Sequence, residues 1–398
     1  MSITWQLACG FGLALAGLTS VARGDINTDW DVTTCDVVAA AKPPTPMGVR
    51  IVAIAQTAAY EAVNRATSGE RVSGVSPEAA VAAAYRSALL ALVPSQSAMI
   101  DAAYRRSLDA LAEGAAAKAG IAIGERAAAE VVARKADDGA TTAESYRPVT
   151  SPGVYVPTTI PAVSQWTQRK PWLMASAAQF RPGPPPALGS ATWARDYNEV
   201  KAMGAKDKST RSAEQTDVAR FWEATLPSIY HGVVRSVAEQ PGRDITRNAR
   251  LFAAIAQGMD DALVAVFDAK YHYNFWRPIT AIRNGDQDGN DATQRDASWM
   301  PLIDTPMHPE YPCAHCILSA TVGTILQADI GDEPLPPLTT SSYMVAGSKR
   351  SWTTTEEFIK EVSEARICDG VHYRTSTEVG AAMGRKVGGL AAQKFFGL

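Results

Sequence analysis

The sequence predicts an all-α protein, a helical bundle made of two packed sets of antiparallel helices. Three observations favour this fold: apolar residues recur at helical spacing over most of the chain, helix start and stop signals agree with that period, and no alternating strand pattern competes. With 398 residues, the chain is long enough to bury a large core. We therefore expect one extended domain or two closely packed halves.

Residues 1–24 are predicted to be a signal peptide. Small and apolar residues fill positions 7–21 and an acidic stretch follows at residue 25, although no Lys or Arg precedes the apolar segment. An uncleaved apolar anchor is the alternative. No later segment has the roughly 18 uninterrupted apolar residues that a membrane span requires. We expect a periplasmic or secreted protein with no membrane span in its mature part.

Residues 25–146 are predicted to form an N-terminal helical region. The region is rich in alanine, and Ser76-Pro77-Glu78 combines an N-cap, a proline at the first helical position and an early acid. Helices are expected at residues 48–66, 77–92, 96–112 and 114–136.

Residues 147–188 interrupt the helical pattern. Nine prolines and two tryptophans in this stretch predict an extended crossing between the two helical regions. A loop of this length within a compact domain is usually functional or a tether.

Residues 189–398 are predicted to form the second, catalytic helical region. Helical periodicity resumes at residues 190–203, 211–239, 243–269, 313–328, 355–367 and 377–396.

The charge balance argues against a nucleic-acid binder. Lys and Arg number 38 against 41 Asp and Glu, for a formal net charge of −3, so a surface that neutralises many phosphates is not expected. Any functional positive charge must therefore be gathered locally, from segments that lie far apart in the sequence.

The first such segment carries Lys270 and Arg277. They are seven positions apart, so a continued helix would place both on one face, although Pro278 indicates that the helix ends there. Two converging cations repel each other unless an anion lies between them. This segment predicts an anion site.

The second segment surrounds His315. Pro312 suits the first turn of a helix, so the free backbone N–H groups of Cys313, Ala314 and His315 would point at a bound anion. His315 then occupies the place of a proton donor. A histidine that only caps the helix is the plain alternative.

The third segment holds Arg366 and His372. A spacing of six puts them on different faces of an ideal helix, but Gly370 suggests that the helix breaks between them. With that break, both side chains can turn into one pocket.

Together the three segments resemble the superfamily that joins vanadium-dependent haloperoxidases with soluble bacterial acid phosphatases and type 2 phosphatidic acid phosphatases. That family's pattern is Lys-x6-Arg-Pro, then Pro-Ser-Gly-His, then Ser-Arg-x5-His-x3-Asp. Its five charged or imidazole positions match Lys270, Arg277, His315, Arg366 and His372 in order and spacing. The departures are Cys313 for Ser, Ala314 for Gly, Ala365 for Ser and Ser376 for Asp. The flanking residues are more similar to the haloperoxidase-related branch, and the likeness is close over residues 250–398.

The resemblance implies a helical bundle and a role for each matched residue. His372 would bind vanadate, or form a phosphohistidine if phosphate binds. Lys270, Arg277 and Arg366 would hold the oxyanion oxygens, with Cys313 and Ala314 beside them. His315 would be the catalytic acid–base. His308 matches a position beside the halide, and a plain loop histidine is the alternative.

The function that the resemblance implies is a vanadate-dependent haloperoxidase, which activates hydrogen peroxide to oxidise a halide, bromide or iodide in preference to chloride. One alternative is a phosphatase that hydrolyses a soluble phosphoester in the same pocket, where phosphate can replace vanadate. Another is a non-catalytic oxyanion-binding homologue, to which the departures at Cys313 and Ala314 point. The protein can be a monomer or a homo-oligomer, and the sequence does not distinguish the two.

The cysteines add one structural expectation. Removal of residues 1–24 would leave Cys35, Cys313, Cys316 and Cys368, and an oxidising compartment would permit disulfides. If both motifs line one pocket, Cys368 should approach the 313–316 segment. We therefore expect a Cys316–Cys368 disulfide, or else Cys313–Cys368. A local Cys313–Cys316 bridge and free buried thiols are the alternatives.

Overall fold

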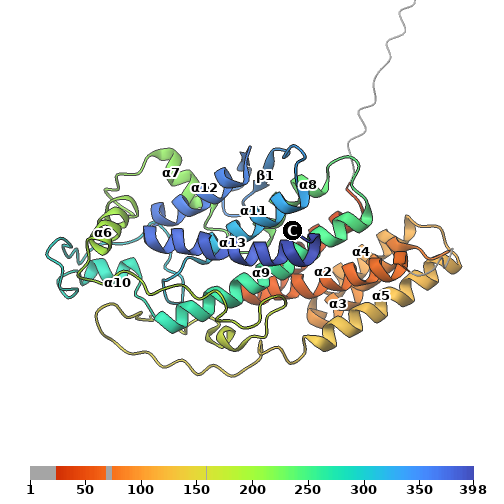
Figure 1. The fold of residues 1–398 in the computed structure, drawn as a ribbon, viewed down its shortest axis with the longest axis horizontal. Coiled ribbons are helices and arrows are strands. Elements are labelled where there is room, and N and C mark those ends of the chain that lie inside the picture. Colours follow the sequence, from red (N-terminus) through yellow and green to blue (C-terminus); the bar gives the residue numbers. More distant parts are fainter. Residues whose placement is uncertain (1–23, 69–73, 158) are drawn as a thin grey trace, which may run out of the picture.

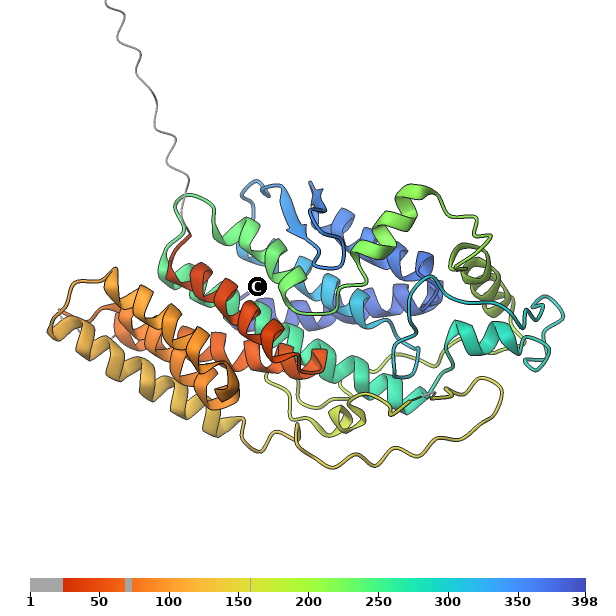
Figure 2. The same ribbon diagram turned by 180° about the vertical axis from the view of Figure 1, so that it is seen from behind.

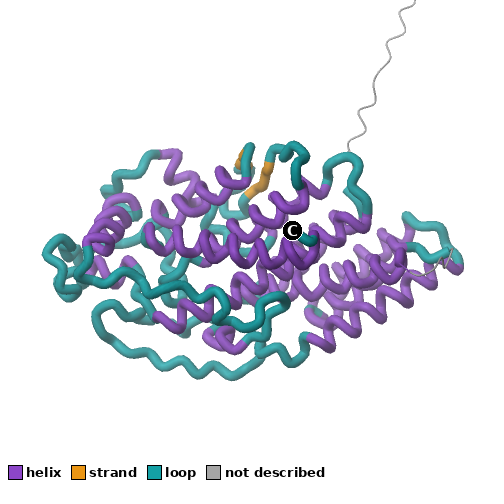
Figure 3. The backbone as a smooth tube through the Cα atoms, viewed as in Figure 1, coloured by secondary structure: helices purple, strands orange, loops and turns teal. Residues whose placement is uncertain are grey.

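A computed structural model describes residues 24–68, 74–157 and 159–398. In this part of the chain the predicted all-α fold is confirmed: helices α1 to α13 are joined by loops, and strand structure is limited to one small hairpin (Figures 1 and 3). The expected signal peptide falls almost entirely on residues 1–23, outside the described residues. No helix in the described part is long and apolar enough to cross a membrane.

The N-terminal helices form one end of an elongated molecule (Figure 1). They are α1 (Ile26–Ala41), α2 (Thr45–Ser68), α3 (Pro77–Leu92), α4 (Ser97–Asp109) and α5 (Ala115–Arg134), with a 3₁₀ turn at Pro94–Gln96. Their shared core is dominated by small side chains, mostly alanine, which lets the helices pack closely. Helix α1 was not expected. Its buried face carries polar residues that hydrogen-bond to other helices, so it lacks a simple apolar stripe.

The second set of helices surrounds the long helix α9. Its members are α6 (Ala191–Met203), α7 (Ala213–Phe221), α8 (Ser228–Ala238), α9 (Ile245–Tyr273), α10 (Pro278–Arg283), α11 (Ala314–Ile330), α12 (Thr355–Cys368) and α13 (Arg374–Phe396). Strands β1 (Leu338–Ser341) and β2 (Lys349–Trp352) pair antiparallel. The single helix expected at 211–239 is in fact two, because α7 ends at Phe221 and the chain turns before Pro227 opens α8.

Helix α9 is the axis of the fold. Almost every residue between positions 248 and 270 is buried, as expected for a helix that contacts others on all sides. It packs on α2 on one side and on α11 and α13 on the other, so it joins the two helical sets (Figures 1 and 2). Helices α11 and α13 approach closely because Gly384 has no side chain: a Cβ there would lie 2.3 Å from the Ile317 carbonyl oxygen.

The proline-rich stretch 147–188 runs along the outside of α9, with one 3₁₀ turn at Ser164–Gln168 (Figure 2). Buried carboxylates of α9 hold it in place. The guanidinium of Arg169 pairs with Asp260 at 2.8 Å. Asp261 accepts backbone N–H groups of residues 172, 173 and 174 at 2.6, 2.8 and 2.9 Å. Burial raises the pKa of Asp261 to about 6, which these hydrogen bonds oppose.

We expect Asp261→Ala to loosen this crossing. Three N–H groups, one of them fully buried, would lose their acceptor, so the free energy of unfolding should fall by about 2–4 kcal/mol. Chemical denaturation measures the change. Asp137→Ala is the control, because Asp137 is fully exposed and pairs with Lys170 at the surface. An equal loss of stability in both variants would contradict this account of the crossing.

Candidate functional site

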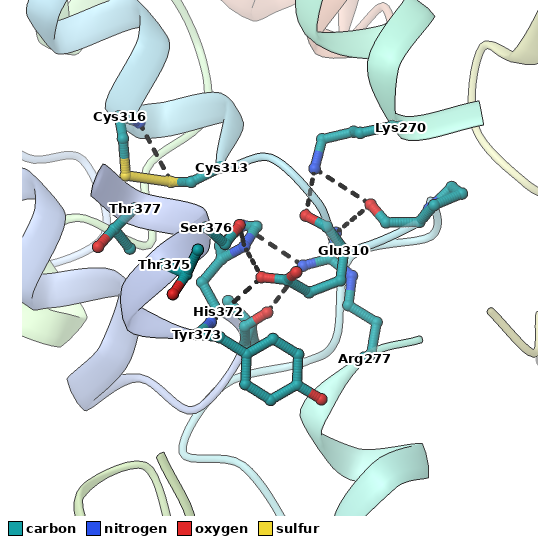
Figure 4. A network of polar contacts seen from close by, with 12 residues as sticks. Lys270, Arg277, Glu310, Cys313, Cys316, His372, Tyr373, Thr375, Ser376 and Thr377 are labelled. Carbon is teal, nitrogen blue, oxygen red and sulfur yellow. Dashed lines mark hydrogen bonds and ion pairs between the residues drawn. A yellow bond between two sulfur atoms is a disulfide. The ribbon is translucent and has the colours of Figure 1, made fainter. Parts of the chain in front are cut away.

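The three sequence motifs meet at one end of α9. A cavity of about 580 Å³ opens there, and its lining includes His308, Ala314, His315, Arg366 and His372. Lys270 and Arg277 lie behind this wall, where both are buried and hydrogen-bond to the loop that carries His308. The structure thus brings together the cations that were expected to converge, and Figure 4 shows Lys270 and Arg277 beside His372.

Lys270 lies in the last turn of α9 and is completely buried. Its Nζ donates hydrogen bonds to the carbonyl oxygens of Pro309 at 3.1 Å and Glu310 at 2.7 Å. Burial lowers the pKa of Lys270 well below its usual value, and the positive charges of Arg277 and Arg366 lower it further. The ammonium group therefore lacks a full counter-charge.

Arg277 reaches the same point by a different route from the one expected. Asn274 ends α9 in a left-handed conformation with φ of 50°, so the continued helix that would align Lys270 with Arg277 does not form. Arg277 is instead the N-cap residue of α10. Its Nη1 donates to the Val371 carbonyl at 2.9 Å and lies 3.4 Å from His372 Nε2. Burial lowers the pKa of Arg277 to about 10.

Arg366 is buried near the C-terminal end of α12. Its Nη1 donates to the Trp222 carbonyl at 2.8 Å and lies 2.8 Å from Asp369 Oδ2 in an ion pair. Burial raises the pKa of Asp369 to about 7, although Arg366 opposes that rise. The Nε atom of Arg366 has no hydrogen-bond partner among the described residues, so a buried donor is left for a ligand.

His372 follows the break that Gly370 was expected to make. Helix α12 ends at Cys368, and Gly370 has a φ of 85°, a conformation that glycine adopts without strain. The backbone N–H of His372 then donates to the Arg366 carbonyl at 3.1 Å. Burial and the nearby Arg277 and Lys270 lower the pKa of His372 well below its usual value, so the imidazole is neutral.

Glu310 was not predicted, yet it fixes the orientation of His372. Its Oε1 lies 2.7 Å from His372 Nδ1, and the same oxygen accepts the N–H of Tyr373 at 3.2 Å (Figure 4). A carboxylate at this distance places the imidazole proton on Nδ1 and leaves Nε2 unprotonated, with Arg277 Nη1 3.4 Å away. Burial raises the pKa of Glu310 to about 7, while Lys270 and Arg277 act against this rise.

A sequence signal for Glu310 did exist. Ser376 stands where the family pattern has Asp, and its Oγ lies only 3.4 Å from His372 Nδ1. The acid missing at position 376 is supplied from the other segment, in the stretch between His308 and Pro312. The Ser at position 376 therefore indicated that the carboxylate beside His372 would come from a segment outside the third motif.

His315 and His308 both line the cavity. His315, in the first turn of α11, donates from Nε2 to the Ala224 carbonyl at 3.1 Å. His308 Nδ1 lies 2.9 Å from Arg277 Nη2, and its ring contacts Phe267 edge-on. Burial lowers the pKa of both imidazoles well below the usual value, and Arg366 adds to this for His315, as Arg277 does for His308. Both rings are therefore neutral.

The disulfide expectation was wrong. Cys313 is bonded to Cys316, with 5.4 Å between their Cα atoms, while Cys368 and Cys35 are free and buried. Cys313 and Cys316 lie one helical turn apart at the start of α11, which brings their sulfurs together (Figure 4). Cys368 faces the other way, into a small apolar cluster around Ile303.

The disulfide is also incompatible with the role in anion binding that was expected of Cys313. Its sulfur has no proton to donate, and its backbone N–H donates to the Ser376 carbonyl at 3.1 Å instead of facing the cavity. Neither the side chain nor the N–H of Cys313 can serve as expected, whereas Ala314 does line the cavity.

The residues present fit a tetrahedral oxyanion. Three buried cations face two carboxylates, Glu310 and Asp369, so the site holds an excess of positive charge. The free Nε of Arg366 and the unprotonated Nε2 of His372 add a donor and a coordinating atom. Burial first, and then repulsion by Arg277 and Arg366, lower the pKa of Lys270, and an anion between the cations would offset that repulsion.

Fold and site together describe an all-helical protein in which three buried cations and a neutral imidazole meet at one end of α9, and this description can be compared with known proteins. Residues 250–397 match the family model of the second helical-bundle domain of vanadium chloroperoxidase. The resemblance that the three motifs indicated is thereby confirmed.

Individual relatives give the same picture. The chain is 26% identical over 176 residues to the vanadium chloroperoxidase of Curvularia inaequalis, a match that covers 36% of this chain and 28% of that enzyme. A bacterial vanadium-dependent iodoperoxidase has the same fold with a TM-score of 0.80 at 23% identity, over 93% of this chain and 96% of the other. The apo and holo forms of a bacterial vanadium-dependent chloroperoxidase give TM-scores of 0.71 and 0.70 at 17% and 16% identity. Both alignments cover 88% of this chain, and they cover 92% of the apo chain and 91% of the holo chain.

We expect Glu310→Ala to weaken orthovanadate binding about 10- to 100-fold, because His372 would lose the hydrogen bond that orients it. Isothermal titration calorimetry measures the affinity. Glu310→Gln should lose less, since its amide oxygen can accept the same hydrogen bond. Adding Ser376→Asp to Glu310→Ala should restore part of the affinity.

The control for this series is Glu113→Ala, at an exposed acid in the other helical set. Unchanged affinity in Glu310→Ala, with the protein folded, would show that Glu310 does not position His372.

Proposed function

We propose that this protein is a vanadate-dependent haloperoxidase, which uses hydrogen peroxide to oxidise a halide. One observation carries the proposal: a neutral imidazole, His372, has its Nε2 unprotonated and 3.4 Å from Arg277 Nη1, and Lys270 and Arg366 are near enough to lower its pKa. Vanadate bound there would supply the activation of peroxide, without a change of metal valence. The protein's own part is to bind and orient the oxyanion and to move protons.

Electrostatic stabilisation is the task of the three cations. Lys270, Arg277 and Arg366 are buried and held by backbone carbonyls or by Asp369, so their positions are fixed before any ligand arrives. Donors fixed in this way stabilise oxygen charge without reorganisation. The pKa of Lys270 is low in the structure, and the negative charge of a bound anion would stabilise its protonated form.

Proton transfer falls to His315. The ring lines the cavity beside Arg366 and His372, and its neutral form can take up a proton from peroxide and return it to a leaving oxygen. Its hydrogen bond to the Ala224 carbonyl occupies Nε2, so Nδ1 is the nitrogen left to accept a proton.

For the halide, we propose iodide or bromide in preference to chloride. The likeness to a bacterial iodoperoxidase supports this choice, as does the imidazole of His308 at the cavity wall. We further propose a periplasmic or secreted location, which the apolar leader and the Cys313–Cys316 disulfide support.

The two histidines should separate binding from turnover. His372→Ala is expected to abolish orthovanadate retention, because it removes the coordinating nitrogen. His315→Ala should still bind orthovanadate but lose about 100-fold or more in the rate of iodide or bromide oxidation. Calorimetry and a peroxide-dependent halide assay measure the two properties.

Equal orthovanadate binding by the wild type and His372→Ala would refute the assignment. Phosphate release from p-nitrophenyl phosphate that vanadate inhibits, with no halide oxidation, would identify a phosphatase instead. Tight phosphate binding with neither activity would identify a non-catalytic oxyanion-binding protein.

A further inference from the structure

The cavity in front of the oxyanion site is larger than the proposed reagents need. Hydrogen peroxide and a halide ion have one or two heavy atoms, whereas the cavity measures about 580 Å³. Volumes of roughly 300–1,000 Å³ are typical of sites that bind organic molecules. The remaining volume is large enough to hold an organic molecule as well.

The lining is charged at its deep end and largely apolar elsewhere, with Lys42 and Glu223 as further charged residues. Arg366 and His372, both almost fully buried, mark its deep end, whereas the exposed Met307 and Met344 mark its mouth. Large apolar side chains from several segments also line it, namely those of Leu226, Leu263, Phe267 and Leu318. A hydrated halide gains nothing from such walls, but an apolar molecule gains by leaving water.

One wall of the cavity is held in place by specific hydrogen bonds. The hydroxyl of Tyr343, in the loop after β1, accepts the backbone N–H groups of Thr225 and Leu226 at 2.7 and 2.9 Å. These bonds join the turn between α7 and α8 to the segment that carries Met344. The apolar wall is therefore fixed relative to the polar end.

We propose that this cavity binds the organic molecule that accepts the halogen, an apolar and electron-rich aromatic compound. Its ring would lie against Leu226, Phe267 and Leu318, with the reacting carbon toward His315 and His372. This inference rests on the proposed haloperoxidase function and adds its acceptor. Halogen transfer then takes place inside the protein instead of in bulk water.

The chemistry balances with the reagents already named. Hydrogen peroxide takes two electrons from the halide and, with one proton, gives hypohalous acid and water. The aromatic carbon then bonds to the halogen as the oxygen–halogen bond breaks. The ring proton leaves with the hydroxide of the hypohalous acid as a second molecule of water.

Binding of 2-naphthol to the vanadate-loaded protein tests the site without turnover. We expect saturable binding, followed by naphthol fluorescence, and at least a tenfold loss of affinity in Leu226→Glu. Leu226 is only partly buried, so a charge there is compatible with folding, and Met307→Glu is the second variant. Met99→Glu is the control, because Met99 is an exposed apolar residue on α4.

A competition experiment tests halogen transfer. With bromide and peroxide, the enzyme should brominate 2-naphthol over 4-phenolsulfonate at least fivefold more selectively than reagent hypobromite does. In Leu226→Glu this selectivity should fall to that of the reagent, while Met99→Glu should keep it.

Two results would overturn the inference: absence of saturable naphthol binding, or a wild-type selectivity equal to that of hypobromite while halide oxidation proceeds. Failure of the proposed function looks different. Naphthol would then bind saturably, but the protein would oxidise no halide even without an acceptor, which would remove the halogen-transfer step with it.

Discussion

The interaction on which the site depends is the repulsion between three buried cations. Lys270, Arg277 and Arg366 come from three helix ends and are all buried; Arg366 pairs with Asp369, whereas burial lowers the pKa values of Lys270 and Arg277. Such an arrangement is costly unless a ligand compensates it, because charges without partners are strongly disfavoured in a protein interior. Hydrogen bonds to backbone carbonyls hold the cations in place before a ligand binds; the carbonyls are those of residues 309, 310, 371 and 222. The rest of the fold can be understood as the framework that keeps these charges together.

Helix α9 and the proline-rich crossing provide much of that framework. The helix is enclosed on all sides, and its C-terminal turn presents Lys270 to the loop before α11. Arg181, at the far end of the crossing, pairs with Asp268, only two positions from Lys270. Together with the contacts to Asp260 and Asp261, this pair fastens the crossing along the part of α9 that leads to the site. A long loop thereby supports the position of the cations, and its Ala162 also lines the cavity.

Most of the helices could be predicted from the sequence, because they depend on local spacing, and the resemblance of the three motifs indicated the five cationic or imidazole positions that the structure brings together. What could not be predicted depends on contacts between distant segments. Glu310 reaches His372 only because the loop before α11 folds over the end of α12, and no periodicity reveals that approach. The disulfide was assigned to the wrong partner because proximity within a pocket says nothing about which way Cys368 faces. Helix α1 was missed because its buried face is polar and has partners on other helices.

The central claim is that the three motifs form one oxyanion site with His372 as its covalent ligand. The most direct test is a crystal structure of the protein soaked with orthovanadate, with the vanadium located by its anomalous scattering. The account predicts a single strong peak within bonding distance of His372 Nε2, with Lys270, Arg277 and Arg366 around its oxygens. Vanadium bound elsewhere, or no peak beside His372 at saturating orthovanadate, would contradict it.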